Sequence, residues 1–278
     1  MTYDNAQAAG SVSKELRIKM HAMYDHFPDC HPVEGLPYIE CYSDTYVSEC
    51  VAPGKNNIAL LLEPKSMIGQ AYEYVKAHHD YFAYIFTHDS ELLKLPNAKF
   101  FLWCNLWLQS DEKKDKSISL CTSYKNWCPL HNARLELAKY YEKTSQVDVY
   151  YGDWNNPSIP TIEPRTYLSR YKYSIVIEND IDDYWFTEKI LNCFGTKTVP
   201  IYVGATKIHE FFNPDGIIRV DNWEDIPKII NNLDLDREYE TRKEAIEDNY
   251  RRAEKYKTGW KERFFSDYDE ILEELANE

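Results

Sequence analysis

The stretch YSIVIENDIDDYWFTEKILNCFGTKTVPIYVG, residues 173–204, changes its hydrophobic pattern three times. It opens with a continuous apolar segment, which is typical of a strand buried on both faces of a parallel sheet. After an acidic loop, Ile190, Leu191 and Phe194 recur at the spacing of one helical face. The apolar segment TVPIYVG then closes the stretch. The pattern predicts a strand, a helix that begins near Thr187, and a second parallel strand.

Glu188 and Lys189 fall in the first turn of this predicted helix. A lysine there opposes the helix macrodipole at a cost of about 0.3–1 kcal/mol, so a bound anion at the same helix end would stabilise it. A diphosphate would serve as that anion, and the carboxylate of Glu188 would suit the paired hydroxyls of a ribose. In the alternative interpretation Glu188 complements the dipole and Lys189 lies in solvent. The residues alone leave both interpretations open.

The charged run QSDEKKDKS (109–117) separates two series of alternating strands and helices. A solvated charge run is more often a linker than a site, so we place a domain boundary within it. The predicted domains are 1–115 and 116–278, the second ending in charged helices from Asp236 onward. Because strands that alternate with helices form parallel sheets, the sequence predicts an α/β protein with two Rossmann-like domains.

The elements of the two series are expected at the following places. Apolar runs predict strands in the first domain, at 57–64, 82–89 and 99–108. In the second domain a helix over 130–143 is expected to turn Leu135, Ala138 and Tyr141 toward the sheet. Its strands are expected at 117–123, 147–152, 173–178 and 198–204.

Composition limits the partners and the compartment. The chain of 278 residues has a formal net charge of −14, so general binding to nucleic acid is not expected. No apolar run approaches the ~20 residues of a membrane span, and the start of the chain lacks the apolar core of a signal peptide. The seven cysteines have no metal-type spacing. These features predict a cytoplasmic protein with reduced thiols and no membrane span.

Three motifs of the opening stretch carry a family resemblance. A Glu-Asn pair ends the first strand (178–179), Thr-Glu-Lys begins the helix (187–189), and Val-Pro-x-x-x-Gly forms the next strand (199–204). Together with FFNPDGII (211–218), they resemble the α1,3-fucosyltransferase signature of family 10 glycosyltransferases. The resemblance implies a GT-B fold, in which two Rossmann-like domains with parallel sheets face a central cleft. It also implies inverting transfer of L-fucose from GDP-fucose to a hydroxyl of a glycan acceptor, without a cofactor or a metal.

The resemblance also implies roles for particular residues of the second domain. Glu188 would bind the ribose and Lys189 the diphosphate. Arg134, expected in the first turn of the helix over 130–143, would bind the diphosphate as well. Trp185 stands where the family has tyrosine, so an indole N–H replaces a phosphate-directed hydroxyl. The full set of predicted donor-binding residues is Arg134, Glu178, Asn179, Trp185, Glu188 and Lys189.

The predicted catalytic base is Glu63, at the end of the strand NIALLLEP. An inverting transfer needs a base for the proton of the acceptor hydroxyl, and the family places its catalytic glutamate in a similar strand-end segment. The alternative is a glutamate bonded to backbone amides. Asp-x-Asp triplets at 180–182 and 234–236 imitate a metal motif, but neither follows a convincing strand, so no metal is expected.

Two other functions remain open at the level of sequence. The same fold could use another nucleotide sugar, because Trp185 alters the pocket. A non-catalytic relative that binds a glycan or a nucleotide is the alternative from a different class. Hydrolysis of GDP-fucose would separate an enzyme from a binder, and a panel of nucleotide sugars would separate the two enzymes.

Overall fold

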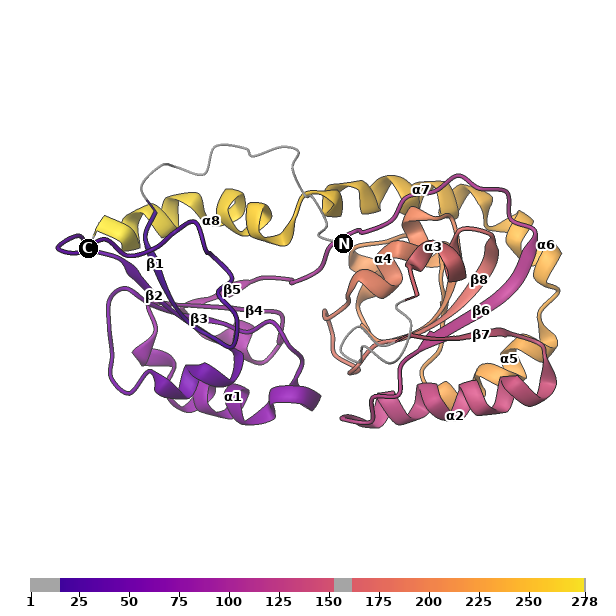
Figure 1. Cartoon of the computed structure of the whole chain (residues 1–278), viewed down its shortest axis with the longest axis horizontal. Coiled ribbons are helices and arrows are strands. Elements are labelled where there is room, and N and C mark those ends of the chain that lie inside the picture. Colours follow the sequence, from indigo (N-terminus) through magenta and orange to yellow (C-terminus); the bar gives the residue numbers. More distant parts are fainter. Residues whose placement is uncertain (1–15, 153–161, 278) are drawn as a thin grey trace. The chain divides into compact units, whose positions relative to one another are not determined.

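The computed structural model describes residues 16–152 and 162–277, and the chain divides into two compact units (Figure 1). As far as they are described, the segments of the first unit are 1–63, 68–102 and 258–278. Those of the second unit are 64–67 and 103–257. The first unit therefore differs from the predicted domain 1–115 by including the end of the chain, with the helix α8 (Trp260–Asn277).

A five-stranded parallel sheet forms the centre of the first unit, in the order β1-β2-β3-β4-β5. Its strands are β1 (Ile18–His21), β2 (Ile39–Ser43), β3 (Asn57–Leu60), β4 (Tyr84–Thr87) and β5 (Ala98–Phe100). The helix α1 (Lys65–Ala77) connects β3 to β4. The predicted strand at 99–108 is much shorter than expected, because the chain leaves the first unit after Leu102.

Two apolar layers cover this sheet. On the side of α1, the buried residues Tyr72 and Val75 pack with Leu61 and Ile85 of the sheet. On the side of α8, Phe264 packs edge-on against Phe86, with ring centroids 4.8 Å apart, and against Phe101, at 5.1 Å. Figure 1 shows the two helices on opposite faces of the sheet. This aromatic packing explains why the last helix belongs to the first unit, although residues 103–257 separate it from the sheet in sequence.

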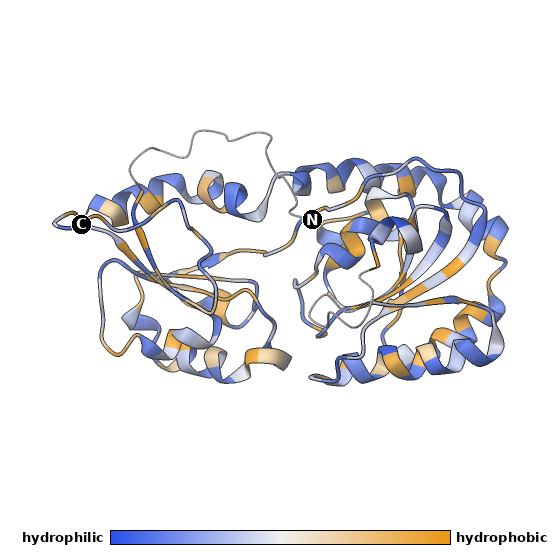
Figure 2. Ribbon diagram, viewed as in Figure 1, coloured by the Kyte–Doolittle hydropathy of each residue, from blue (hydrophilic) through white to orange (hydrophobic). Residues whose placement is uncertain are grey.

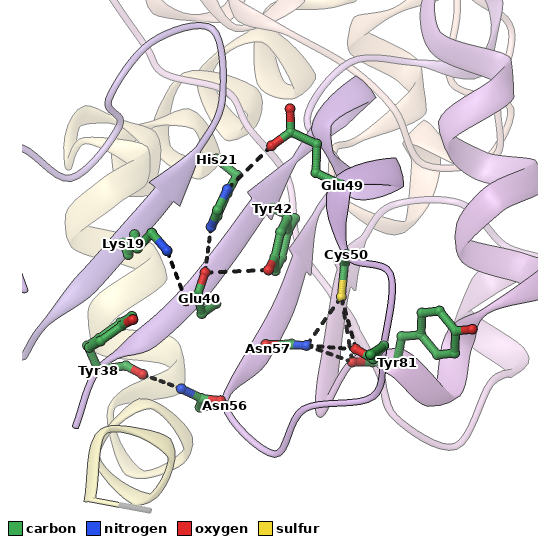
Figure 3. A network of polar contacts seen from close by, with 11 residues as sticks. Lys19, His21, Tyr38, Glu40, Tyr42, Glu49, Cys50, Asn56, Asn57 and Tyr81 are labelled. Carbon is green, nitrogen blue, oxygen red and sulfur yellow. Dashed lines mark hydrogen bonds and ion pairs between the residues drawn. The ribbon is translucent and has the colours of Figure 1, made fainter.

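Polar contacts fix the register of the first two strands (Figure 3). Glu40 of β2 accepts hydrogen bonds from Lys19 at 3.1 Å and contacts the ring of His21 at 2.5 Å. The other ring nitrogen of His21 lies 3.4 Å from Glu49, and the His21 ring stacks on Tyr42. Because Lys19 and His21 bind a residue of the neighbouring strand, a slip in register would separate these charges.

The second unit has a five-stranded parallel sheet in the order β10-β9-β8-β6-β7. Its strands are β6 (Lys116–Thr122), β7 (Asp148–Tyr151), β8 (Tyr171–Ile177), β9 (Val199–Val203) and β10 (Ile218–Arg219). The four predicted strands of this domain are confirmed. The order reverses between β6 and β8, which makes the carboxyl ends of these two strands a topological switch point.

Helices cover the second sheet. Figure 2 shows hydrophilic and hydrophobic residues mixed along each of the longer helices. In α2 (Pro129–Thr144), Ala138 and Tyr141 are buried as predicted, but the fully buried leucine is Leu137 and Leu135 is only partly covered. Ile190, Leu191 and Phe194 of α4 (Glu188–Gly195) are buried as predicted. The remaining helices are α3 (Pro164–Leu168), α5 (Ile226–Asn232), α6 (Leu235–Thr241) and α7 (Lys243–Ala253).

Candidate functional site

A cavity of about 280 Å³ lies in the second unit at this switch point. Residues at and after the end of β6, residues at the end of β8, and the first two turns of α2 and α4 line it. In parallel sheets ligands bind beyond the carboxyl ends of the strands, where helix N-termini present free N–H groups. Four of the six predicted donor-binding residues line the cavity: Arg134, Asn179, Glu188 and Lys189.

The start of α4 is fixed by a buried carboxylate. Glu178, which is 0% exposed, accepts hydrogen bonds from the backbone N–H of Thr187 at 2.9 Å and from its hydroxyl at 2.8 Å. The hydroxyl of Thr187 in turn accepts from the backbone N–H of Lys189 and caps the helix. The prediction that Glu188 and Lys189 form the first turn is confirmed. Glu178, which directly follows β8, binds Thr187 at the start of the helix, and it does not line the cavity.

Gly204 of the sequence motif leaves space for this carboxylate. A Cβ atom at this position would lie 2.7 Å from Cγ of Glu178, which is closer than carbon atoms approach without a shift. The backbone at the end of β9 must therefore pass close to Glu178, and only glycine permits this approach. The motif glycine and the motif glutamate are thus two parts of one packing arrangement.

The ammonium group of Lys189 lies among several oxygens. It donates to the hydroxyl of Thr187 at 2.9 Å and to Glu178 at 3.2 Å, and it lies 3.6 Å from Glu188. Burial lowers the pKa of Lys189, but Glu178 and Glu188 outweigh burial and the pKa is raised from its ordinary value. Lys189 is therefore a fixed positive charge. The carboxylates of Glu178 and Glu188 offset its position in the first helical turn, and the bound anion expected at this helix end stays a prediction.

Arg134 is the second cation of the cavity, and its contacts are different. It is 8% exposed, and its guanidinium donates to the carbonyl of Leu130 at 3.3 Å and to Oδ1 of Asn179 at 2.7 Å. Within the part of the chain that the structure describes, it forms no ion pair with a carboxylate. The prediction that Arg134 lies in the first helical turn was wrong, because α2 begins at Pro129 and Arg134 lies in its second turn.

His131 belongs to the site, and sequence reasoning missed it. It is 5% exposed; its Nδ1 accepts from the backbone N–H of Trp127 at 3.2 Å, and its Nε2 lies 3.1 Å from Oδ1 of Asn179. Since Nδ1 is an acceptor, Nε2 carries the proton and donates to Asn179. Burial and the nearby Arg134 lower the pKa of His131 to about 4. The signal in the sequence was its place one helical turn before Arg134.

The other cavity residues surround this polar group. Ser123 and Lys125 come from the loop after β6, and the indole of Trp107, which is 56% exposed, lines the cavity as well. Trp185 does not line it: the side chain is 1% exposed and is one of the largest fully buried groups of the chain. The role of Trp185 in donor binding stays a prediction.

Glu63, the predicted base, belongs to the first unit and is partly exposed. The strand β3 ends at Leu60, four residues earlier than expected. The ladder stops because the backbone N–H groups of Leu62 and Glu63 donate to the side chain of Asp44, at 2.8 and 3.2 Å, instead of to a neighbouring strand. The catalytic role of Glu63 stays a prediction.

Two other features are absent from the described residues. They contain no group of three or more histidine, cysteine, aspartate or glutamate side chains arranged to hold a metal ion. Among residues 16–152 and 162–277, no helix combines the length and the apolar character needed to cross a membrane.

Comparisons with known proteins agree with the resemblance in the sequence. Among curated proteins, the chain is 24% identical over 136 residues to a putative fucosyltransferase-like protein of Arabidopsis thaliana. It is 31% identical over 65 residues to the alpha-(1,3)-fucosyltransferase FucT of Helicobacter pylori. It is also 31% identical over 117 residues to a 4-galactosyl-N-acetylglucosaminide 3-alpha-L-fucosyltransferase of Homo sapiens. These alignments cover 48%, 23% and 40% of this chain but only 26%, 14% and 32% of the relatives.

Among solved structures, the chain is similar to a crystal structure of an alpha1,3-fucosyltransferase. The TM-score is 0.55 at 14% identity, and the superposition covers 96% of this chain and 93% of the other. This likeness confirms the predicted fold class, an α/β fold of the GT-B type with two Rossmann-like units. Residues 111–246, which carry most of the cavity, match the model of the C-terminal part of glycosyltransferase family 10 (fucosyltransferase).

Proposed function

We propose that the protein is an inverting glycosyltransferase that moves L-fucose from GDP-fucose to a hydroxyl of a glycan acceptor. The second unit would bind the nucleotide diphosphate, and the first would supply the catalytic base. The matched family and the names of the relatives support the choice of fucose, and the cavity at the switch point supports a nucleotide donor.

The observation that carries the proposal is the state of Arg134. A buried guanidinium costs several kcal/mol unless an anion or good acceptors surround it. Arg134 donates to two neutral oxygens and lines the cavity, and a guanidinium has five N–H groups in all. A diphosphate would supply the missing negative charge, and the fork of N–H groups suits its oxygens.

The neighbours of Arg134 would complete the diphosphate site. Lys189 would add a second charge, because this residue lines the cavity while Glu178 and Thr187 fix the position of its ammonium group. Glu188 would accept hydrogen bonds from the ribose. Asn179 would act indirectly, since its Oδ1 already binds Arg134 and His131 and so sets the direction of the guanidinium.

The size of the cavity fits a part of the donor. At about 280 Å³ it lies just below the usual range of about 300–1,000 Å³ for sites of small ligands. It would hold the diphosphate and its adjoining ribose, with the base and the sugar outside it. This assignment places the reacting carbon at the mouth of the cavity, next to the negative charge that leaves.

In the proposed reaction the acceptor oxygen attacks the anomeric carbon of fucose from the face opposite the diphosphate. The bond from that carbon to the phosphate oxygen breaks, GDP leaves with the electron pair, and the configuration inverts. The carboxylate of Glu63 takes the proton of the acceptor hydroxyl. Arg134 and Lys189 stabilise the charge that develops on the diphosphate, so the proposed step routes no electron pair through a metal.

Thermal denaturation with a panel of nucleotides tests the proposal. A ligand that binds only the folded state at 100 times its Kd stabilises it by about 2.7 kcal/mol. We expect GDP and GDP-fucose to raise the Tm more than UDP, ADP and their sugars do. Arg134→Met should abolish most of this shift, whereas Arg219→Met, at an exposed arginine of β10, should preserve it.

Two results would contradict the proposal. Equal shifts with all nucleotides would reject the choice of donor. A shift in the Arg134→Met protein as large as that of the wild type would reject the cavity as the diphosphate site.

A further inference from the structure

Both polar groups of the Glu63 backbone, its N–H and its carbonyl, form hydrogen bonds to side chains. Its N–H donates to Oδ1 of Asp44 at 3.2 Å, and its carbonyl accepts from the hydroxyl of Tyr72 at 2.8 Å. The N–H of Leu62 also donates to Oδ1 of Asp44, at 2.8 Å. The side chain of Glu63 is partly exposed. A backbone held at both of its polar groups therefore carries a carboxylate that is not fully buried, and catalytic groups require such fixed support.

Asp44 adopts an uncommon backbone conformation to make these contacts. Its φ is +50°, in the left-handed region that costs a non-glycine residue roughly 1–3 kcal/mol, less for aspartate than for most. It follows directly after Ser43, which with Leu60 forms the last pair of the β2–β3 ladder. Beyond the end of the ladder, the side chain of Asp44 accepts the hydrogen bonds of the Leu62 and Glu63 amides, which a backbone carbonyl of β2 would accept if the ladder continued.

The other residues with positive φ give a useful contrast. Among the described non-glycine residues these are Ser145 and Lys197, and Ser145 forms the ordinary left-handed cap of α2. Asp44 instead begins the 3₁₀ helix Asp44–Glu49 and directs its carboxylate at another strand. Strained residues of this kind cluster where the surrounding structure has to hold a functional group in place.

The carboxylate of Asp44 is largely buried where it accepts the two amide hydrogen bonds. Burial raises the pKa of Asp44, while the amide hydrogen bonds from Leu62 and Glu63 oppose that rise. On the opposite side of Glu63, the hydroxyl of Tyr72 lies 3.0 Å from Nε2 of His88. Since this hydroxyl donates to the carbonyl of Glu63, it accepts from His88, and the tyrosine cannot rotate away freely.

We propose that Asp44 is a positioning residue for catalysis: its side chain fixes the backbone of Glu63 so that the glutamate carboxylate is held at the reacting hydroxyl. The inference rests on the proposed function, in which Glu63 is the base. It assigns to Asp44 the acceptance of two hydrogen bonds, with its negative charge playing no part in the proton transfer. Tyr72 assists by holding the carbonyl of the same residue.

Three substitutions separate the hydrogen bonds from the charge and from the strain. Asp44→Asn keeps an oxygen that can accept both amides and tolerates positive φ, so kcat for hydrolysis of GDP-fucose should stay within about threefold of wild type. Asp44→Gly relieves the strain but removes the acceptor, and kcat should fall by about 10- to 100-fold. Tyr72→Phe should also lower kcat, but by a smaller factor than Asp44→Gly.

Two further readouts distinguish positioning from general damage. The KM for GDP-fucose and the Kd for GDP should not change in any of these variants, because the cavity belongs to the second unit. The pH at which kcat falls on the acidic side should be the same in Asp44→Asn as in wild type. Ser145→Gly, which also puts glycine at a positive φ, is the matched control for Asp44→Gly, and only the latter should lose turnover.

The same series includes Glu63→Gln, so that the two proposals can fail separately. If Glu63→Gln keeps full activity, the role of Glu63 in the proposed function is rejected. If Glu63→Gln is inactive but Asp44→Gly turns over like wild type, only the positioning role is overturned. A shifted pH profile in Asp44→Asn would also overturn it, because the charge and not the hydrogen bonds would then matter.

Discussion

At the scale of single residues, the positive charge in the cavity depends on two side chains, Arg134 and His131, that bind the same oxygen of Asn179. Oδ1 of Asn179 receives hydrogen bonds from Arg134 and from His131 at once, and the histidine can donate only in its neutral Nε2–H form or as a cation. A second cation beside Arg134 would be repelled. A neutral His131 therefore lets the site place one guanidinium, and not two positive charges, at this point.

Stability measured against pH tests the neutral state of His131. The folded pKa of about 4 lies below the ordinary 6.5, so the unfolded chain binds more protons between these values. The free energy of unfolding should consequently fall as the pH drops from 6.5 to 4, by about 1–3 kcal/mol from this residue. In His131→Gln the fall between these pH values should be smaller by that amount.

Chemical denaturation at several pH values supplies the measurement. His209→Asn, at an exposed histidine of the same unit, is the control and should keep the wild-type slope. Identical slopes in His131→Gln and wild type would mean that His131 is protonated in the folded protein as readily as in the unfolded chain.

Tryptophan fluorescence can show which of two indoles, Trp107 or Trp185, lies next to the bound nucleotide. The resemblance assigns Trp185 to the donor pocket, whereas in the structure Trp107 lines the cavity and Trp185 is buried. Binding of GDP should change the emission of the wild type, and Trp107→Phe should remove most of this change. Trp185→Phe should retain it. Loss of the response in Trp185→Phe alone would support the assignment from sequence and a different conformation of the loop 179–186.

At the scale of elements, the start of α4 connects stability to binding. Thr187 caps the helix and holds Lys189 and Glu178 together, so one hydroxyl serves both functions. Thr187→Ala should lower the free energy of unfolding by about 1–2 kcal/mol and weaken GDP binding. Thr187→Ser, which keeps the hydroxyl, should restore both.

A cap elsewhere in the same unit provides the comparison. Asn222 caps the 3₁₀ helix Trp223–Asp225, and Asn222→Ala should cost stability without changing the affinity for GDP. Calorimetric titration of GDP with denaturation of the same samples would show both effects. If Thr187→Ala loses stability but binds GDP like wild type, the position of Lys189 does not depend on the cap.

The elements themselves were largely predictable, but some of their ends and phases were not. The strands β6, β7, β8 and β9 and the helix α4 were predicted well, because apolar runs mark these strands and a threonine precedes Glu-Lys at the helix start. The end of β3 could not be predicted, because it depends on Asp44, whose carboxylate replaces a ladder partner from 18 residues away. The phase of α2 was wrong at Leu135, since the helix begins at Pro129 and this start decides which leucine faces the sheet.

The candidate site was predictable in part for similar reasons. Charged residues in a helix start, such as Glu188 and Lys189, are visible in sequence because helix ends have a fixed electrostatic preference. His131 was not, because nothing in the sequence shows that its ring meets Asn179, which lies 48 residues away. Long-range contacts of this kind follow from the strand order, and a single sequence contains no direct signal for that order.

At the scale of the whole molecule, the two sheets have different topologies. The first runs in simple chain order from β1 to β5, whereas the second reverses between β6 and β8. A reversal creates the gap between strand ends in which ligands bind, so we propose the nucleotide site for the second unit. Glu63, Asp44 and Tyr72, the residues proposed for the base and its support, belong to the first unit. The proposed activity needs one group from each unit, and neither unit should catalyse transfer alone.

The most direct test of this account is the release of GDP from GDP-fucose, measured for wild type, Glu63→Gln and Arg134→Met, with water or a glycan as acceptor. Wild type should release GDP and yield fucose or a fucosylated product. Glu63→Gln should be slower by at least about 100-fold, the usual contribution of a general base, with unchanged affinity for GDP. Arg134→Met should bind GDP more weakly. A wild-type protein that binds GDP but never releases it from GDP-fucose, or a Glu63→Gln protein with wild-type turnover, would contradict the account.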